Sequence, residues 1–327
     1  MRTLYMGRRI LITDLHSDSL LAALDRGRDI TLRSDEGHMD IPRLIEGNVA
    51  VQLFAAFVAP SYYPDRSLAR ADALIQAFMD ACDRSDVMKQ ARSHSDIERI
   101  TDSNGIAGIL SIEGGDALGG NTSALEHFCS LGVRALTLTW SYSNQIADGI
   151  YEKFPDGSVG NGGLTDFGRE VIEAMKGLGI LVDVSHISER SFWDVIAVSD
   201  GPVIATHSCA HALCAHPRNL KDEQIRAIAE SGGVIGVNFC PDFLSNDGRA
   251  TVDDVIAHID HMSDVGGVEC VALGSDFDGI EHTPEGLEDA TKMKNIAVRL
   301  EEHGYRGSEV EDMMGMNFLR VFKEVCG

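Results

Sequence analysis

Eight apolar runs rich in Val, Ile and Leu recur along the chain, separated by segments of mixed polarity. Each run is apolar on both faces, which is the pattern of parallel strands that helices cover on either side. The runs span residues 10–18, 49–58, 106–115, 134–140, 180–186, 202–208, 233–239 and 270–277. We therefore predict eight buried strands at these positions.

Most segments between these runs space their apolar residues as a helix does. The predicted helices include 70–91, 165–178, 188–198, 221–231 and 251–265, and the C-terminal NFLRVFKEVCG is typical of an amphipathic helix. Several open on a favourable N-cap, such as Thr165, Ser188 or Thr251. Several close on a glycine, as at Gly132, Gly179 and Gly266. This alternation of strands and helices predicts an α/β fold.

Within the α/β class we predict a (β/α)8 TIM-like barrel, and a doubly wound open sheet is the rival. A dinucleotide-binding open sheet has a Gly-rich phosphate turn after its first strand. Here the first run ends in His16-Ser17-Asp18 instead. The chain has 327 residues, which is ordinary for a barrel of about 250 residues with insertions. Because no linker or low-complexity tract divides it, we expect residues 1–327 to form a single domain.

Composition and charge exclude several classes of function. Apolar residues make up 44% of the chain and charged residues 24%, which is typical of a globular protein. No run approaches the roughly 20 apolar residues of a membrane-spanning helix. The net charge of −23 argues against nucleic acid or an anionic membrane as a partner, because both require a basic face.

The cysteines indicate a reducing compartment. They are seven in number and contain no CxxC pair, so we expect free thiols in a cytoplasmic protein. The apolar run after the N-terminal arginines covers only Ile10 to Ile12, which is shorter than the about 7–15 residues of a signal-peptide core.

Five of the eight runs end at residues that can bind a metal or exchange a proton. In a (β/α)8 barrel these ends converge on one mouth, because all strands point the same way. His16 and Asp18 are two residues apart and so face the same side of a strand, although an HxD pair alone is a weak signal. Glu113, in SIEGGD, can bridge two cations with its two oxygens, and an acid that caps the next helix is an equally good interpretation.

The later runs contribute His186, His207 and Asp276. A lone histidine after an apolar run is more often a hydrogen-bonded core residue, but two in neighbouring strands indicate metal ligands. Asp276 can take a proton from metal-activated water, or it can cap the following turn. Asp278 is its near competitor, because residues at i and i+2 share a face, and strand order favours Asp276.

Together these residues predict two metal sites that share one carboxylate. The first would be formed by His16, Asp18 and Glu113, and the second by Glu113, His186 and His207. Mixed histidine and carboxylate ligands suit two Zn²⁺ ions, with manganese or iron as open alternatives. Two cations about 3.5–4 Å apart can share one hydroxide and polarise a carbonyl, which suits hydrolysis of an amide or ester.

Several motifs resemble those of the renal (membrane) dipeptidase family of metallopeptidases, and the resemblance covers nearly the whole chain. They are DLHSD, HMDIPRLIEGNVAVQLFA, SIEGGDAL, LTLTW, GLTDFGREVIEAM, LVDVSHIS, PVIATHS, RNLKDEQIRAIAESGGVIGVNF and ALGSDFDG. The resemblance implies a barrel of the metal-dependent amidohydrolase type and ligands at His16, Asp18, Glu113, His186 and His207. It also implies that Asp276 is the catalytic acid/base and that Arg218 holds the terminal carboxylate of the substrate.

The chain departs from mammalian members of this family at Trp140. Those members have a histidine there that helps to stabilise the tetrahedral intermediate. Trp can donate one hydrogen bond but carries no charge, so this role would fall on the metals or on Asn144. The chain also lacks the signal peptide and lipid-anchor tail of the mammalian enzymes, and the resemblance implies a soluble bacterial-type member.

The main hypothesis is therefore a zinc-dependent dipeptidase acting on small dipeptides, with those that end in a D-residue among the candidates. Another amidohydrolase that cleaves N-acyl amino acids or lactones is the nearest alternative. The role expected for Arg218 requires a free carboxylate, which a lactone lacks. A non-catalytic metal-binding protein is the third hypothesis, and the complete ligand set argues against it. The resemblance also implies a homodimer.

Overall fold

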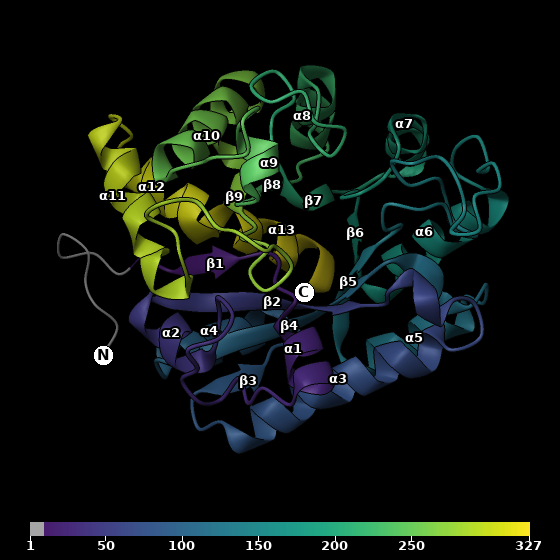
Figure 1. The fold of residues 1–327 in the computed structure, drawn as a ribbon, viewed down its shortest axis with the longest axis horizontal. Helices are drawn as coiled ribbons and strands as arrows, with labels where there is room; N and C mark the ends of the chain where they lie inside the picture. Colours follow the sequence, from purple (N-terminus) through teal and green to yellow (C-terminus); the bar gives the residue numbers. More distant parts are fainter. Residues whose placement is uncertain (1–9) are drawn as a thin grey trace.

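Eight parallel strands pair in sequence order around a barrel in the computed structural model, which describes residues 10–327 (Figure 1). The N-terminal arginines before Ile10 lie outside the described residues. The strands are β1 (Ile12–Asp14), β2 (Val49–Phe57), β4 (Ile106–Glu113), β5 (Val133–Thr137), β6 (Leu181–Asp183), β7 (Val203–Ser208), β8 (Ile235–Val237) and β9 (Val271–Leu273). The predicted (β/α)8 TIM-like barrel is confirmed.

The barrel closes between the segments that follow β1 and β9. The Asp276 N–H donates to the His16 carbonyl over 3.2 Å, and the Asp18 N–H donates to the Phe277 carbonyl over 2.9 Å. A parallel bridge pairs Ser17 with Phe277 between them. This closure brings the chain after the first strand against the chain after the last, so residues 260 apart in sequence become neighbours at the mouth.

Several strands are shorter than predicted. The run 10–18 yields only Ile12–Asp14, and the run 180–186 yields only Leu181–Asp183. The apolar pattern continues past each strand because the turns that follow are buried as well. Of the predicted site residues, Glu113 and His207 lie within strands, whereas the others lie in the turns beyond them.

One strand was missed because the helix predicted over 70–91 is too long. Helix α3 covers Ser67–Arg84, and β3 (Met88–Gln90) pairs with the first residues of β4. The helix ends at Ser85, whose backbone is extended and whose hydroxyl accepts the N–H groups of Val87 and Met88. A side-chain oxygen that satisfies these amides favours a turn over another helical turn.

Helices follow the strands and surround them (Figure 1). Besides α3 they are α1 (Ser19–Arg26), α2 (Ile41–Glu46), α4 (His94–Asp102), α5 (Ser123–Leu131), α6 (Asp166–Leu178), α7 (Glu189–Val198), α8 (Asp222–Glu230), α9 (Pro241–Leu244), α10 (Val252–Gly266), α11 (Lys294–Glu302), α12 (Gly307–Glu311) and α13 (Asn317–Cys326). Short 3₁₀ turns lie at Pro60–Tyr62, Gly115–Leu118, Val268–Cys270 and Ala290–Lys292, and a π turn lies at Asp312–Met316.

The predicted N-caps are confirmed. The side chains of Thr165, Ser188 and Thr251 each accept a backbone N–H from the first turn of α6, α7 and α10. Each such bond satisfies an amide that the helix itself leaves unpaired. The predicted stop at Gly266 is wrong by one residue, because α10 includes Gly266 and Gly267 follows it as the C-cap.

The apolar interior has two parts. The larger cluster lies between the strands and the outer helices, and includes Phe54 and Leu110. The smaller cluster joins residues from inside the barrel, such as Ile109 and Ile204, to Phe318 and Phe322 of α13. Helix α13 therefore packs against the barrel interior, and in Figure 1 it lies among the strands near β9. No helix within residues 10–327 is long and apolar enough to cross a membrane.

Candidate metal centre and substrate cavity

Glu113 is the last residue of β4, and its direction follows from strand alternation. Ala107 and Ile109, at even spacing before it, belong to the apolar cluster inside the barrel. Because side chains alternate between the two faces of a strand, Glu113 points into the same interior. The next residue, Gly114, has φ +96°, a conformation that residues with a Cβ rarely adopt, and it turns the chain away from the mouth.

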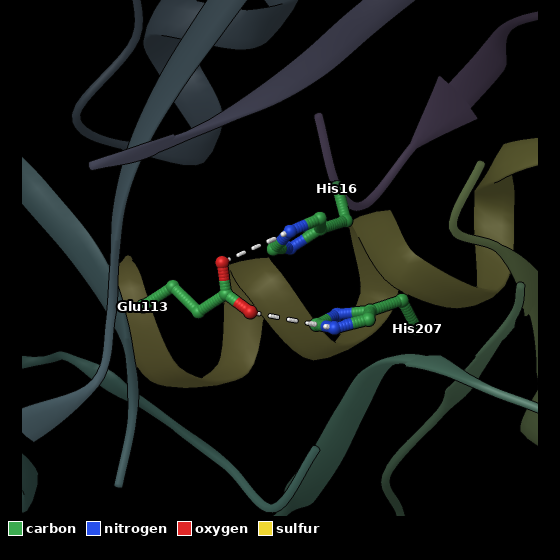
Figure 2. Close-up of side chains that lie close together, drawn as sticks. All are labelled: His16, Glu113 and His207. Atoms are coloured by element: carbon green, nitrogen blue, oxygen red, sulfur yellow. Dashed lines mark ion pairs between the residues drawn. The ribbon is translucent and has the colours of Figure 1, made fainter. Parts of the chain in front are cut away.

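The two oxygens of Glu113 face different histidines (Figure 2). Oε2 lies 3.4 Å from His16 Nε2. Oε1 lies 2.9 Å from His186 Nε2 and 3.6 Å from His207 Nε2. One carboxylate thus joins two groups of possible ligands, which is the arrangement expected for a bridging residue.

His16 also belongs to a second group. Its Nε2 lies 3.5 Å from an oxygen of Asp18 and 3.9 Å from Oδ1 of Asp276. Two sets of side chains have donor atoms close enough together to hold one metal ion, namely His16, Glu113 and His207, and His16, Asp18 and Asp276. His16, in the turn after β1, therefore belongs to both groups, which divide the side chains differently from the two predicted sites.

In two of the histidines, the Nδ1 atom lies within hydrogen-bond distance of a hydroxyl group. His186 Nδ1 lies 3.1 Å from Ser141 Oγ, and His207 Nδ1 lies 2.8 Å from Thr206 Oγ1. Their Nε2 atoms are thereby turned toward each other, 2.9 Å apart. Partners of this kind on the outer nitrogen orient a histidine for metal binding.

Two of the site residues adopt backbone conformations that are unfavourable for side chains with a Cβ. His186 has φ +67° and Asp276 has φ +62°. Such positions cost of order 1–3 kcal/mol and persist where the surrounding structure holds them in place. Both residues lie in the turns just past a strand, and their side chains face the ligand cluster.

The donor atoms fit a divalent cation because some of them lack any other partner. His16 Nε2 and Asp18 Oδ1 are buried, and neither has a hydrogen-bond partner within residues 10–327. Gly279 passes so close that an added Cβ would lie 2.2 Å from Asp18 Oδ2 and 2.4 Å from Asp276 Oδ1. Zinc ligands lie about 2.0–2.3 Å from a tetrahedral ion and hence about 3.3–3.8 Å from one another, and the distances of 3.4, 3.5 and 3.6 Å between the donor atoms of His16, Asp18, Glu113 and His207 agree with this.

The charges of this cluster also favour a cation. Burial, followed by repulsion from Glu113, raises the pKa of Asp18 to about 7. Burial raises the pKa of Asp276 as well. Burial alone would lower the pKa of His16, but the carboxylates of Glu113 and Asp18 raise it well above its usual value. Buried carboxylates without a counter-charge are costly, and a bound cation removes that cost.

The second pair of histidines is held neutral. Burial, followed by the positive charge of Arg218, lowers the pKa of His186 to about 4. Burial and the charges of His16 and Arg218 lower the pKa of His207 well below its usual value. Because a histidine binds metal in its neutral form, this environment prepares both rings as ligands.

The structure separates Asp276 from its competitor Asp278. Asp276 faces His16, whereas Asp278 binds Arg28 through both oxygens and also accepts the Ser19 hydroxyl and the His38 N–H. Asp278 therefore anchors the segment 28–38 and has no capacity left for a proton in the cavity. Spacing along the sequence alone did not distinguish the two.

A cavity of about 580 Å³ opens above the cluster. Its walls include Glu113, Trp140, Arg218, Phe243 and Asp276. Parts of the loops 141–163 and 278–292 line it, whereas the loop 28–48 contacts Asp278. The volume is that of a small-molecule site.

Arg218 is a buried cation without an ion pair among residues 10–327. One of its terminal nitrogens donates to the His207 carbonyl over 3.0 Å, and its Nε is buried without a partner. Its guanidinium lies 5.5 Å from the centre of the Phe243 ring. A buried guanidinium with unused donors at a cavity wall is suited to a carboxylate ligand.

The two other predicted substrate residues have different surroundings. Trp140 lines the cavity, and its ring packs against Phe57 and His186 at 5.2 and 5.9 Å between centres. Asn144 does not line it. Its Nδ2 donates to Leu138 and Asp116, and its Oδ1 accepts two backbone N–H groups, so the amide has no free donor. The structure does not bring Asn144 to the other site residues.

Sequence reasoning gave no role to two further buried polar residues at the mouth. Asp14 accepts the N–H and hydroxyl of Ser275, and burial raises its pKa to about 6. Asn238, which follows β8, donates to Asp276. Asn238 stands near the end of the apolar run 233–239, which is a signal that could have identified it, whereas Asp14 lies inside the run 10–18 and gave no such signal.

Comparison with known proteins decides the family. The model of the membrane dipeptidase family, peptidase family M19, matches residues 2–326. The chain belongs to this family. Dipeptidase tcpJ of Claviceps purpurea is 34% identical over 301 residues, which cover 88% of this chain and 69% of that protein.

Solved structures agree with this assignment. The crystal structure of the metallopeptidase dipeptidase AC, also of family M19, matches with a TM-score of 0.90 at 31% identity and covers 98% of this chain and 100% of that one. A metallopeptidase from Rhodobacter sphaeroides, solved with a phosphinate mimic of the dipeptide L-Ala-D-Ala, matches with a TM-score of 0.88 at 29% identity, covering 97% and 99%. The protein is a metallo-dipeptidase, and dependence on metal follows from its family.

Proposed function

We propose that this dipeptidase hydrolyses small dipeptides, including those that end in a D-residue, with two Zn²⁺ ions held at the barrel mouth. The observation that carries the proposal is the placement of Glu113, whose two oxygens face separate histidines. The D-residue at the C-terminus is supported by the L-Ala-D-Ala mimic bound to the Rhodobacter sphaeroides relative.

The ligands divide into two sets that share Glu113. His16 and Asp18 complete the first set, and His186 and His207 complete the second. This mixture of imidazole and carboxylate suits zinc, and it also accepts manganese or iron. When bound, the two cations activate the attacking water and polarise the scissile carbonyl.

Asp276 accepts the proton of the attacking water in this proposal and returns it to the leaving amine. Its Oδ1 faces the ligand cluster at 3.9 Å from His16 Nε2, and its Oδ2 is held from behind by Asn238. Burial raises its pKa, and a base with a raised pKa is a better proton acceptor near neutral pH.

Arg218 sets the length of the substrate. A guanidinium binds a carboxylate through two parallel hydrogen bonds, and Arg218 lies on the wall of the cavity that also contains Glu113. In this proposal a substrate that reaches both has its free carboxylate one residue from the cleaved bond. Trp140 lines the same cavity and packs against His186, and its ring supplies no charge there.

Metal-free enzyme offers a direct test. Protein stripped with a chelator should hydrolyse no dipeptide, and activity should return as zinc is added up to two equivalents. The same enzyme should then be assayed against dipeptides of both chiralities at the C-terminal position. Activity that peaks at one equivalent, or that survives chelation, would contradict the two-metal proposal.

Assays with a series of N-acyl amino acids distinguish the dipeptidase activity from the alternative amidohydrolase activity. These substrates keep the carboxylate that Arg218 requires but lack the free amino group of a dipeptide. Faster hydrolysis of N-acyl amino acids or of lactones than of dipeptides would favour the other amidohydrolase activity.

The proposal includes the organisation of the protein. We propose a single domain over residues 1–327, working in the cytoplasm as a homodimer. Seven unpaired cysteines suit a reducing compartment. Light scattering of the purified enzyme at micromolar concentration would measure the oligomeric state.

A further inference from the structure

Asn238 is a buried amide beside the proposed proton acceptor. It follows the last residue of β8, has no exposed surface, and its Nδ2 donates to Asp276 Oδ2 over 2.9 Å. Within residues 10–327 this is the one side-chain hydrogen bond that the Asp276 carboxylate receives. Asn238 is not among the ligands, and the proposed chemistry gives it no part.

The orientation of the Asn238 amide is determined by its other contacts. Its Oδ1 accepts the Cys240 N–H over 2.6 Å, and its backbone carbonyl accepts the Cys209 thiol over 3.2 Å. Because a backbone N–H can only donate, the amide oxygen must face Cys240. The amide nitrogen therefore faces Asp276, and the side chain cannot present an acceptor there instead.

Asp276 is held between two strands by this arrangement. Its backbone N–H donates to the His16 carbonyl on the side of β1, and its Oδ2 is bound by Asn238 on the side of β8. The remaining oxygen, Oδ1, faces His16 and the ligand cluster. The two carboxylate oxygens thus have different surroundings, one tied to the protein and one directed into the mouth.

We propose that Asn238 is a positioning residue that occupies one oxygen of Asp276 and thereby directs the other toward the attacking water. The inference rests on the proposed function, in which Asp276 accepts a proton. Without the Asn238 donor, Oδ2 would lose the one side-chain hydrogen bond that it has within residues 10–327. The carboxylate would then rotate to find another partner, and a misplaced base transfers protons slowly.

Two substitutions at Asn238 test this role. Asn238→Ala removes the donor and leaves space that a water molecule can enter. Asn238→Asp keeps the shape of the side chain and the bond to the Cys240 N–H. It replaces the amide donor with a carboxylate oxygen, which then faces Oδ2 of Asp276. Asn317→Ala is the matched control, because Asn317 is also buried and donates to backbone carbonyls, at Val268 and Val271, away from the mouth.

We expect kcat to fall by about tenfold or more in both Asn238 variants, and further in Asn238→Asp. The value of KM should stay within about twofold, and the zinc content measured by atomic absorption should match that of wild type. Asn317→Ala should unfold at a lower temperature while the folded enzyme keeps its kcat. This separation of kcat from KM, metal content and stability is what distinguishes positioning from a general structural role.

The inference would be overturned by wild-type kcat in Asn238→Asp, or by a loss that follows zinc content or KM. An inactive wild-type enzyme loaded with zinc would instead overturn the proposed dipeptidase function, since no substitution is needed to observe it. The two failures are therefore distinct.

Discussion

Asp276 and Asp278 lie two residues apart in the turn after β9, both with a positive φ, and their side chains are 13% and 3% exposed. Asp278 is fully paired, because Arg28, Ser19 and the His38 N–H donate hydrogen bonds to its oxygens. Asp276 belongs to the ligand cluster, where it has one hydrogen bond and faces other acids. A buried carboxylate that is fully paired holds the structure together, whereas one left without a counter-charge indicates a functional site.

The pKa values of the two regions shift in opposite directions. Burial by itself raises the pKa of Asp278, but the charge and hydrogen bonds of Arg28 bring it below its usual value. Burial raises the pKa of Asp276, and no cation offsets it fully. The same residue type is therefore stabilised as an anion in one region and destabilised in the other, although the Asp278 side chain is the less exposed of the two.

The largest effect is expected for Glu113→Gln, which keeps the shape of the bridge and removes its charge. Both metals should be lost together, and activity should fall by more than the about hundredfold typical of a lost general base. Zinc analysis and dipeptide kinetics measure this directly. Glu126→Gln, an exposed position on α5, is the control. Full zinc occupancy with wild-type turnover would refute the bridging role.

Asp276→Asn comes next. Removing the proton acceptor should lower kcat by about 10²-fold or more, because general acid–base groups contribute about that much. Zinc content should stay close to that of wild type. If Asp278→Asn lost this activity while Asp276→Asn kept it, the roles of the two aspartates would have to be exchanged.

Arg218→Met should have a smaller effect that depends on the substrate. A hydrogen bond to a charged group is worth about 1.5–3 kcal/mol, so kcat/KM should fall by about tenfold to a hundredfold. The variant should also lose the preference of wild type for a free dipeptide over its C-terminal amide. Equal cleavage of the free dipeptide and its amide by wild type would show that the enzyme does not recognise the C-terminal carboxylate.

Asp278→Asn should have the smallest effect on turnover of these four substitutions. It should have the largest effect on the free energy of unfolding. Breaking a buried ion pair by removing one partner costs about 3–5 kcal/mol, so the free energy of unfolding should fall while kcat of the folded enzyme changes little. Because the folded-state pKa of Asp278 is depressed, its stabilisation is complete above the unfolded pKa of about 3.9 and is lost as pH falls through the folded value.

Denaturant titrations measure this dependence. The stability difference between wild type and Asp278→Asn should be constant above about pH 5 and should shrink below about pH 4. A difference that grows as pH falls would contradict the pairing with Arg28.

Local pattern was enough to predict the fold class and to single out most of the residues that the structure brings together at the mouth. Apolar runs and N-caps such as Ser188 depend on neighbours along the chain, so they can be recognised without any tertiary contact. The ends of those runs then pointed to Glu113 and His207, because parallel strands bring their carboxyl ends to one mouth.

The direction of a side chain could not be predicted in the same way. Ile204 of β7 lies inside the barrel, whereas Val203 and Ala205 belong to the outer cluster. Simple alternation would therefore turn His207 outward with them. The register of β7 against β8 shifts between Ala205 and Ser208, which breaks this alternation. The His207 side chain lies beside Glu113 at the mouth.

The sequence by itself determined which residues could serve chemistry and in which strand order they come, because hydrophobic periodicity is a local property of the chain. Only the tertiary structure decided that Asp278 is paired with Arg28, that the Asn144 amide is fully occupied and that Asn238 holds Asp276. Those outcomes depend on partners up to 250 residues apart. Burial removes water as the alternative partner, so what remains close in space determines whether a charge is structural or reactive.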